Sequence, residues 1–197
     1  ITDGQTTHVS PTSLMLPEQQ KCTIALTHHN DSLSLYYWKE AESGTLFSER
    51  CINSNRTGQE YPCFGASPEG EGSASAINNI VILNKVLSKV EADLIRQSKY
   101  TGKEEGLIAY WPANEVETDV VEDKAYGRDL KLSSSEAWYS INANYALKLN
   151  GTGNDVRPIS MGDAILTSND SHLHEFWMRA DSLPTSGNAT IMHNTAN

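Results

Sequence analysis

The apolar segments of this 197-residue chain are short, and clusters of Gly, Asn, Asp or Ser separate them at intervals of about ten residues. Short apolar runs between turn residues are typical of antiparallel β structure. Asn, Ser, Thr and Gly are abundant, and charged residues make up only 20% of the chain. The sequence therefore predicts an all-β fold, a sandwich of antiparallel strands.

Runs of alternating or apolar residues mark the expected strands. They lie at 22–27, 32–38, 45–49 and 77–83, and then at 106–111, 129–132, 145–149, 174–178 and 190–192. Within 32–38, a period of two places Leu33 and Leu35 on one face and Tyr36 and Trp38 on the other. The polar segment 51–76 is too long for a hairpin turn, and we expect a loop there of the kind that often carries specificity.

One helix is expected, at 89–98. Ser88 is followed three residues later by Glu91, which is the spacing of a capping box. Leu94 and Ile95 then fall on one face of the helix with Val90. We expect a short surface helix, and the polar segment 99–105 after it is interpreted as a linker.

The charge balance excludes one class of partner. The chain has 15 basic and 25 acidic residues, a net charge of −10, and such a surface repels the phosphates of nucleic acid. No apolar run approaches the roughly 20 residues that a membrane helix needs. The first ten residues also lack the basic start and apolar stretch of an export signal, so we expect any such signal to be already removed.

The three cysteines, Cys22, Cys51 and Cys63, have no C-x-x-C spacing. This argues against a zinc site and against a thioredoxin-type site. A Cys51–Cys63 disulfide across the polar segment would leave one thiol over, and three free cysteines are the open alternative.

Four segments in the second part of the chain resemble a known domain type. They are GLIAYWPANE at 106–115, D-x-x-x-G-x-D-L at 123–130, ALKLNG at 146–151 and HEFWMRAD at 174–181. In this order they resemble the opening half of a laminin G-like, concanavalin A-like domain of bacterial extracellular proteins, and 16–98 resembles its closing half. The resemblance implies an antiparallel jelly-roll sandwich with one short helix and with the halves in permuted order.

The resemblance implies an organisation of 1–98 as the closing half, 99–105 as a linker and 106–197 as the opening half. Two arrangements are open. The chain is an excerpt from a tandem array, or its halves pack together as one permuted or complemented sandwich. Isolated half-sheets would expose open edges and apolar faces, so we favour the second arrangement.

The segment ETDVVE at 117–122 resembles the catalytic strand of jelly-roll retaining glycoside hydrolases. Transferred to this chain, that pattern implies Glu117 as nucleophile, Asp119 as assisting carboxylate and Glu122 as acid/base. A period of two places Glu122 opposite Glu117 unless a bulge intervenes, and the laminin G-like pattern has a polar loop here. We expect a solvated acidic loop and keep the hydrolase as an alternative.

Calcium is the candidate cofactor, since laminin G-like domains often bind it. Hard oxygen ligands near turns are offered by Asp119, Asp123, Asp129 and Asp155. The closing half of such domains commonly reads I-D-D-V, whereas residues 77–80 here read INNI, which removes two carboxylates. Asp123 with Gly127 is interpreted as a turn-forming pair.

Aromatic side chains are the candidate ligand-binding residues, because sugar rings stack on aromatic planes. Trp111 and Trp177 resemble buried positions of the family. Trp38 at a strand end, and Trp138 with Tyr139 in a polar loop, are the surface candidates.

The resemblance implies an extracellular, secreted or cell-surface recognition module of a larger bacterial protein, without enzymatic activity. Its expected partners are a glycan or a surface protein, together with neighbouring domains of the parent chain. One alternative is a retaining glycoside hydrolase using Glu117 and Glu122. Another is a structural spacer or assembly subunit that completes a neighbouring sheet by strand addition.

Overall fold

The computed structural model describes residues 18–29, 32–39, 45–50, 59–64, 74–86, 100–114, 118–132, 138–141, 144–150, 156–158, 166–167, 172–182 and 191–196. All regular elements within these ranges are β-strands. The prediction of an all-β chain is therefore confirmed for this part of the sequence. The helix expected at 89–98 lies outside the described residues.

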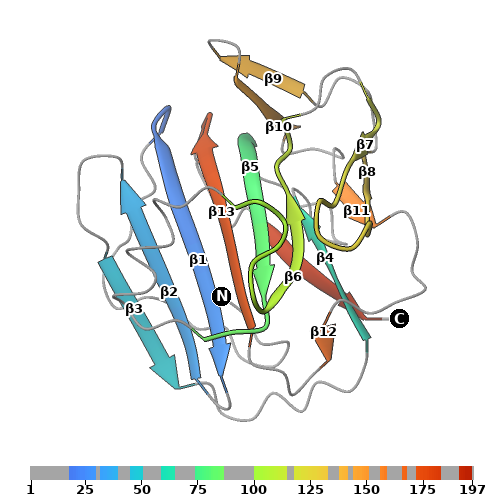
Figure 1. The fold of residues 1–197 in the computed structure, drawn as a ribbon. Helices are drawn as coiled ribbons and strands as arrows, with labels where there is room; N and C mark the ends of the chain where they lie inside the picture. The colour runs from blue at the N-terminus through green and yellow to red at the C-terminus, as the bar shows by residue number, and fades with distance from the viewer. Residues whose placement is uncertain are drawn as a thin grey trace.

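The strands belong to two sheets (Figure 1). The larger sheet contains β1 (Lys21–His29), β2 (Ser32–Lys39), β3 (Thr45–Arg50), β5 (Ala74–Leu83), β6 (Leu107–Trp111), β9 (Trp138–Ile141), β10 (Asn144–Asn150) and β13 (His172–Ala180). The smaller sheet contains β4 (Gln59–Phe64), β7 (Val120–Val121), β8 (Leu130–Leu132), β11 (Val156–Pro158), β12 (Leu166–Thr167) and β14 (Met192–Ala196).

Pairing between these strands is antiparallel in both sheets. The larger sheet has the order β3-β2-β1-β13-β5-β10-β9, and β6 pairs with the second half of β5. The smaller sheet has the order β12-β4-β11-β8-β7, and β14 pairs with β4. Strands from the two halves of the sequence are direct neighbours, since β1 pairs with β13, β5 with β10 and β4 with β11.

Two segments that were expected to be loops contain strands. The segment 51–76 includes β4, and the polar stretch around Trp138 includes β9. The letters QEYPCF show no apolar alternation, and β4 is held instead by pairing with β14, β11 and β12. Its last residue, Phe64, is fully buried. Tertiary pairing therefore decides the structure of β4, and local sequence pattern does not.

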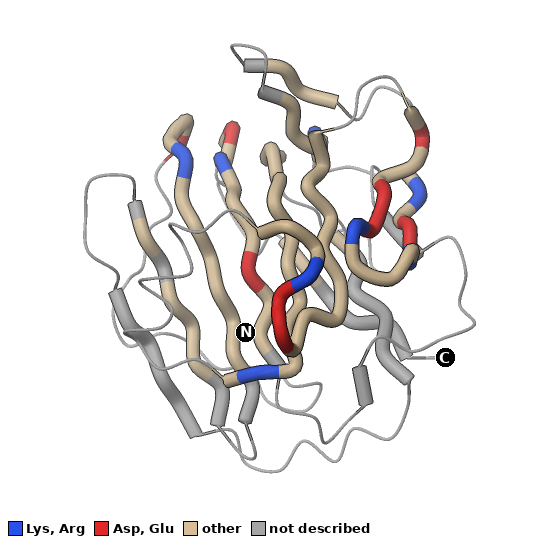
Figure 2. Tube along the Cα trace, in the orientation of Figure 1, with Lys and Arg blue, Asp and Glu red and all other residues tan. Residues whose placement is uncertain are grey.

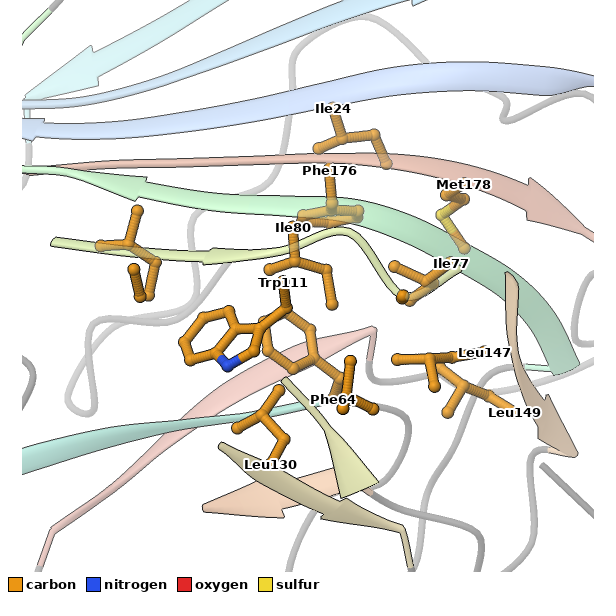
Figure 3. Packing of buried hydrophobic residues seen from close by; sticks show 14 of the residues in the cluster. Ile24, Phe64, Ile77, Ile80, Trp111, Leu130, Leu147, Leu149, Phe176 and Met178 are labelled. Carbon is orange, nitrogen blue, oxygen red and sulfur yellow. The ribbon is translucent and has the colours of Figure 1, made fainter. Parts of the chain in front are cut away.

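The main core lies between the two sheets (Figure 3). The larger sheet contributes Ile24, Ile77, Ile80, Trp111, Leu147, Phe176 and Met178, and the smaller sheet contributes Phe64, Leu130 and Leu132. Phe64 and Phe176 meet edge to face across the layers, with ring centroids 6.2 Å apart. One core therefore joins residues from both halves of the chain.

A second apolar cluster lies on the opposite face of the larger sheet, which we call the outer face. Its buried members are Ala25, Tyr36, Trp38, Val81, Leu83, Leu107, Tyr110 and Leu173. The loop at 100–106 crosses this face in front of β13 and β5 (Figure 1), and its Tyr100 packs against the cluster. The outer face is thus buried at Val81 and Leu83 of β5 and at Leu173 of β13, whereas the other end of β13 is partly exposed on this face.

A bulge in β5 marks the point where its neighbour changes from β10 to β6. The register against β13 shifts between Glu175 and Trp177, where Asn79 has a φ of 50°. The Asn79 N–H donates to the carbonyl of Pro112 at 3.0 Å. The side-chain amide of Asn78 donates, through Nδ2, to the backbone carbonyl of Tyr145 on β10 at 3.3 Å. The INNI segment thus has a structural role, because Asn tolerates the left-handed backbone that a bulge requires.

Candidate functional site: the outer face of the larger sheet

Strand β13 places charged and aromatic side chains on the outer face by simple alternation. Phe176, Met178 and Ala180 point into the main core. The residues between them, Trp177 and Arg179, therefore point outward, because successive side chains of a strand alternate. Both are partly exposed.

Each of these outward residues forms a contact between a cation and an aromatic ring. The Lys21 Nζ lies 3.2 Å from the centroid of the Trp177 ring, and the Arg179 guanidinium carbon lies 4.7 Å from that of Tyr139. Figure 2 shows basic residues at the neighbouring ends of β1 and β13. We call Lys21, Tyr139, Trp177 and Arg179 the cation–aromatic strip. Such contacts hold aromatic rings in fixed orientations at a partly exposed surface.

Hydrogen bonds fix the Arg179 end of the strip. Its Nη2 donates to the Tyr139 hydroxyl at 2.7 Å and to Oδ1 of Asp181 at 2.8 Å. The hydrogen bond from Arg179 to Asp181 raises the pKa of the guanidinium above its ordinary value, so Arg179 stays charged at any physiological pH.

Small residues let Tyr139 and Arg179 meet. Strands β9 and β13 are separated by β10 and β5. Ala146 of β10 lies opposite Tyr139, and Ala76 of β5 lies opposite Arg179. Since cross-strand partners share a face, the two long side chains reach toward one another over these alanines.

A buried acid lies further along the same face. Glu175 is 4% exposed, and its Oε2 accepts a 2.9 Å hydrogen bond from the Tyr100 hydroxyl. Burial raises the pKa of Glu175 to about 7, and the hydrogen bond from Tyr100 opposes part of that rise. Burial first, and then the charge of Glu175, also raises the pKa of Tyr100 above its ordinary value. Glu175 therefore changes charge near neutral pH.

The structure places the three aromatic ligand candidates differently. Trp38 is 2% exposed and stacks on Tyr36 with ring centroids 5.7 Å apart, so the prediction that it is a surface residue is wrong. Trp138 packs against the main core, and its indole N–H donates to the Thr118 carbonyl at 2.8 Å. Tyr139, the next residue of β9, points to the opposite face and belongs to the strip. Because successive side chains of a strand alternate, Trp138 and Tyr139 lie on opposite faces of the sheet.

Among the calcium candidates, Asp123 organises a turn. Its Oδ1 accepts from the N–H groups of Tyr110 and Ala125 at 2.9 Å. Its Oδ2 accepts from those of Tyr126 and Arg128 at 3.1 Å. All four donors are backbone amides. Three belong to the turn that follows Asp123, and the fourth belongs to Tyr110 on β6, so the carboxylate shapes its turn and joins it to the larger sheet. Both oxygens of this buried carboxylate are therefore already in use.

Of the other calcium candidates, Asp129 lies next to Asp123, and Asp119 does not share its hydrogen bonds. Asp129 accepts from the Asp123 N–H at 2.9 Å, and Asp119 has an exposed side chain. Asp155 lies outside the described residues. Within the described part of the chain, no three metal-ligating side chains come together.

The structure brings no catalytic pair together in the described part of ETDVVE. Glu117 lies outside the described residues, and Asp119 and Glu122 flank the short strand β7 with exposed side chains. Glu122 forms an ion pair with Lys124.

Cys22 is the cysteine whose side chain the structure describes. Cys22 is a buried free thiol on β1, and burial raises its pKa to about 12, which keeps it protonated and unreactive. Cys51 lies outside the described residues. Cys63 belongs to β4, where its side chain is not described, so the Cys51–Cys63 disulfide stays a prediction.

Sequence reasoning missed most of the strip. It placed Trp177 with the buried family positions, and it gave no role to Lys21 or Arg179. The signal was present in HLHEFWMRA, because strict alternation from Phe176 and Met178 in the core puts Glu175, Trp177 and Arg179 on the other face. The partners of these residues come from distant strands, which no local pattern reveals.

No protein-family model matches the chain, and no curated protein matches it either. No helix among the described residues is long and apolar enough to cross a membrane.

Proposed function

We propose that the chain is a carbohydrate-recognition module that binds its ligand on the outer face of the larger sheet. The observation that carries this proposal is the cation–aromatic strip, in which two partly exposed aromatic rings are each held by a basic side chain. Sugar sites combine an aromatic plane with a few fixed polar groups. The strip offers Trp177 and Tyr139 as planes and Arg179 with Asp181 as fixed polar groups.

We further propose that the fold is the laminin G-like jelly roll and that the module acts outside the cell, as part of a larger protein. Support for the fold comes from the antiparallel pairing of strands from both halves of the sequence and from the core that they share. The location and the larger parent protein follow from the sequence resemblance alone. Recognition of a protein surface, a passive spacer role and glycoside hydrolysis are the rival functions. No observation on the described residues favours any of these three functions over carbohydrate recognition.

A glycan array tests the proposal. We expect selective binding by the wild-type protein and loss of that binding in Trp177→Ala. Tyr126→Ala is the matched control, because Tyr126 is an exposed aromatic residue, 67% accessible, in the turn held by Asp123. Its removal should leave glycan binding unchanged. A folded wild-type monomer that binds no glycan would contradict the proposal and favour a protein contact or a spacer.

A further inference from the structure

Two basic residues flank one small residue on the outer face. Arg179 of β13 and Lys148 of β10 both lie opposite Ala76 of β5 in the sheet register. Cross-strand partners point to the same face, so both cationic side chains leave the sheet on the outer side, from Cα atoms roughly 10 Å apart. Ala76 is too short to separate them. The register therefore places a guanidinium and an ammonium group within reach of one ligand.

Arg179 has donors to spare. A guanidinium carries five N–H donors on three nitrogens, and only Nη2 makes the hydrogen bonds to Tyr139 and Asp181. Nε is buried and has no acceptor among the described residues. The two hydrogen bonds that Arg179 makes to described residues both leave from Nη2, so neither uses Nη1. Because the buried Nε is closed to a ligand, the donor left for an oxyanion on this guanidinium is Nη1.

The described acidic residues near this end of the sheet lie on the β13 side of Ala76, away from Lys148. Asp181 forms an ion pair with Arg179. Glu18 forms an isolated backbone β-bridge with Ala180, on the β1 side of β13. Lys148 is exposed on β10, beyond β5. No described carboxylate pairs with it. Among the described residues, Asp181 offsets the charge of Arg179, and Lys148 adds one positive charge to this surface, in a chain with a net charge of −10.

We propose that Arg179 and Lys148 bind the carboxylate of an acidic sugar, so that the ligand of this face is a polysaccharide containing uronic acid. This inference rests on the proposed carbohydrate-binding function and names its substrate class. A guanidinium matches the planar geometry of a carboxylate, and the ammonium adds a point charge. Tyr139, held by Arg179, places an apolar plane next to that pair, where the sugar ring would lie.

Calorimetric titration of the whole chain tests this, with oligogalacturonate as one probe and the same oligosaccharide methyl-esterified at its carboxylates as the other. The acid is expected to bind and the ester to bind at least about tenfold more weakly. Lys148→Gln should weaken binding of the acid about tenfold and leave binding of the ester unchanged. Lys131→Gln is the matched control, because Lys131 is an exposed lysine on β8 of the other sheet. It should bind both probes as the wild type does.

Other results would overturn the inference. Equal affinity for acid and ester, with Trp177→Ala abolishing both, would leave the proposed carbohydrate function standing and remove the carboxylate site. Equal weakening by Lys148→Gln and Lys131→Gln, with dextran sulfate binding as well, would mean nonspecific charge attraction only. Failure of both probes would exclude the uronic acid assignment, and the glycan array would then decide the proposed function separately.

Discussion

The hydroxyl of Tyr100 donates a 2.9 Å hydrogen bond to Oε2 of Glu175, a residue 75 positions further along the chain. Tyr100 begins the loop that crosses the outer face, and Glu175 lies in the middle of β13. Both side chains are largely removed from water. The bond therefore attaches a loop to the sheet through a carboxyl group that titrates near neutral pH.

This arrangement predicts how stability depends on pH. The pKa of Glu175 rises from about 4.5 to about 7 on folding because of burial, so between these values the folded chain keeps a proton that the unfolded chain has lost. The free energy of unfolding should therefore fall as the pH rises from 5 to 8, by up to about 3 kcal/mol from this group. Urea titrations across this range measure the slope.

Glu175→Gln supplies the control for that experiment, since an amide oxygen can still accept from Tyr100 but cannot ionise. The variant should be more stable than the wild type at pH 8, and the difference should vanish near pH 5. A difference that stays constant with pH would show that Glu175 does not titrate in this range.

Asp123 is expected to matter for stability. Asp123→Ala removes the acceptor of four backbone N–H groups, and the loss should be about 3 kcal/mol or more in urea unfolding. Asp119→Ala, which changes an exposed carboxylate, should stay within about 0.5 kcal/mol of the wild type. Similar losses for both variants would mean that the four hydrogen bonds contribute little.

Calcium should not stabilise the fold through Asp123. Its two oxygens already accept four hydrogen bonds, so a cation there would have to displace amide donors of its own turn or of Tyr110 on β6. We expect the same melting temperature in calcium and in chelator. A higher melting temperature in calcium that Asp123→Ala abolishes would revive the aspartate site.

Gly102 and Gly127 offer a matched pair of backbone tests. Both have a positive φ, at 86° and 72°, so alanine is strained at each. A Cβ at Gly102 would also lie 2.5 Å from the carbonyl oxygen of Lys124, whereas one at Gly127 would meet nothing within 4 Å. Gly102→Ala should therefore cost about 1 to 3 kcal/mol more than Gly127→Ala in thermal or urea unfolding. Equal costs would indicate that the 100–106 loop shifts freely.

The strands that could be predicted are those with a clear local pattern. Alternation in SLSLYYW and the apolar run of INNIVIL located β2 and β5 to within a few residues. The strands β4 and β11 lack such a pattern, because what holds them is pairing with partners far away in the sequence. Their existence depends on tertiary contacts that single-sequence reasoning does not contain.

The candidate site shows the same limit. Tyr139 was selected as a ligand-binding residue from its aromatic character alone, and the structure places it against Arg179, 40 residues away. Trp38 was selected by the same reasoning, but the outer face of β2 is covered and Trp38 is buried. Alternation along a strand predicts which face a side chain points to. It does not predict whether that face is exposed, because this depends on what packs against it.

The most direct measurement follows the four tryptophan indole N–H signals in a ¹H–¹⁵N spectrum while the most strongly bound oligosaccharide of the array is added. Trp177 points to the outer face with Lys21 on its ring, whereas Trp111 is fully buried and donates to the Arg128 carbonyl at 2.9 Å. We predict a ligand-dependent shift of the Trp177 signal and none for Trp111. A saturable shift of the Trp138 signal with Trp177 unchanged would place the binding site elsewhere and contradict the account.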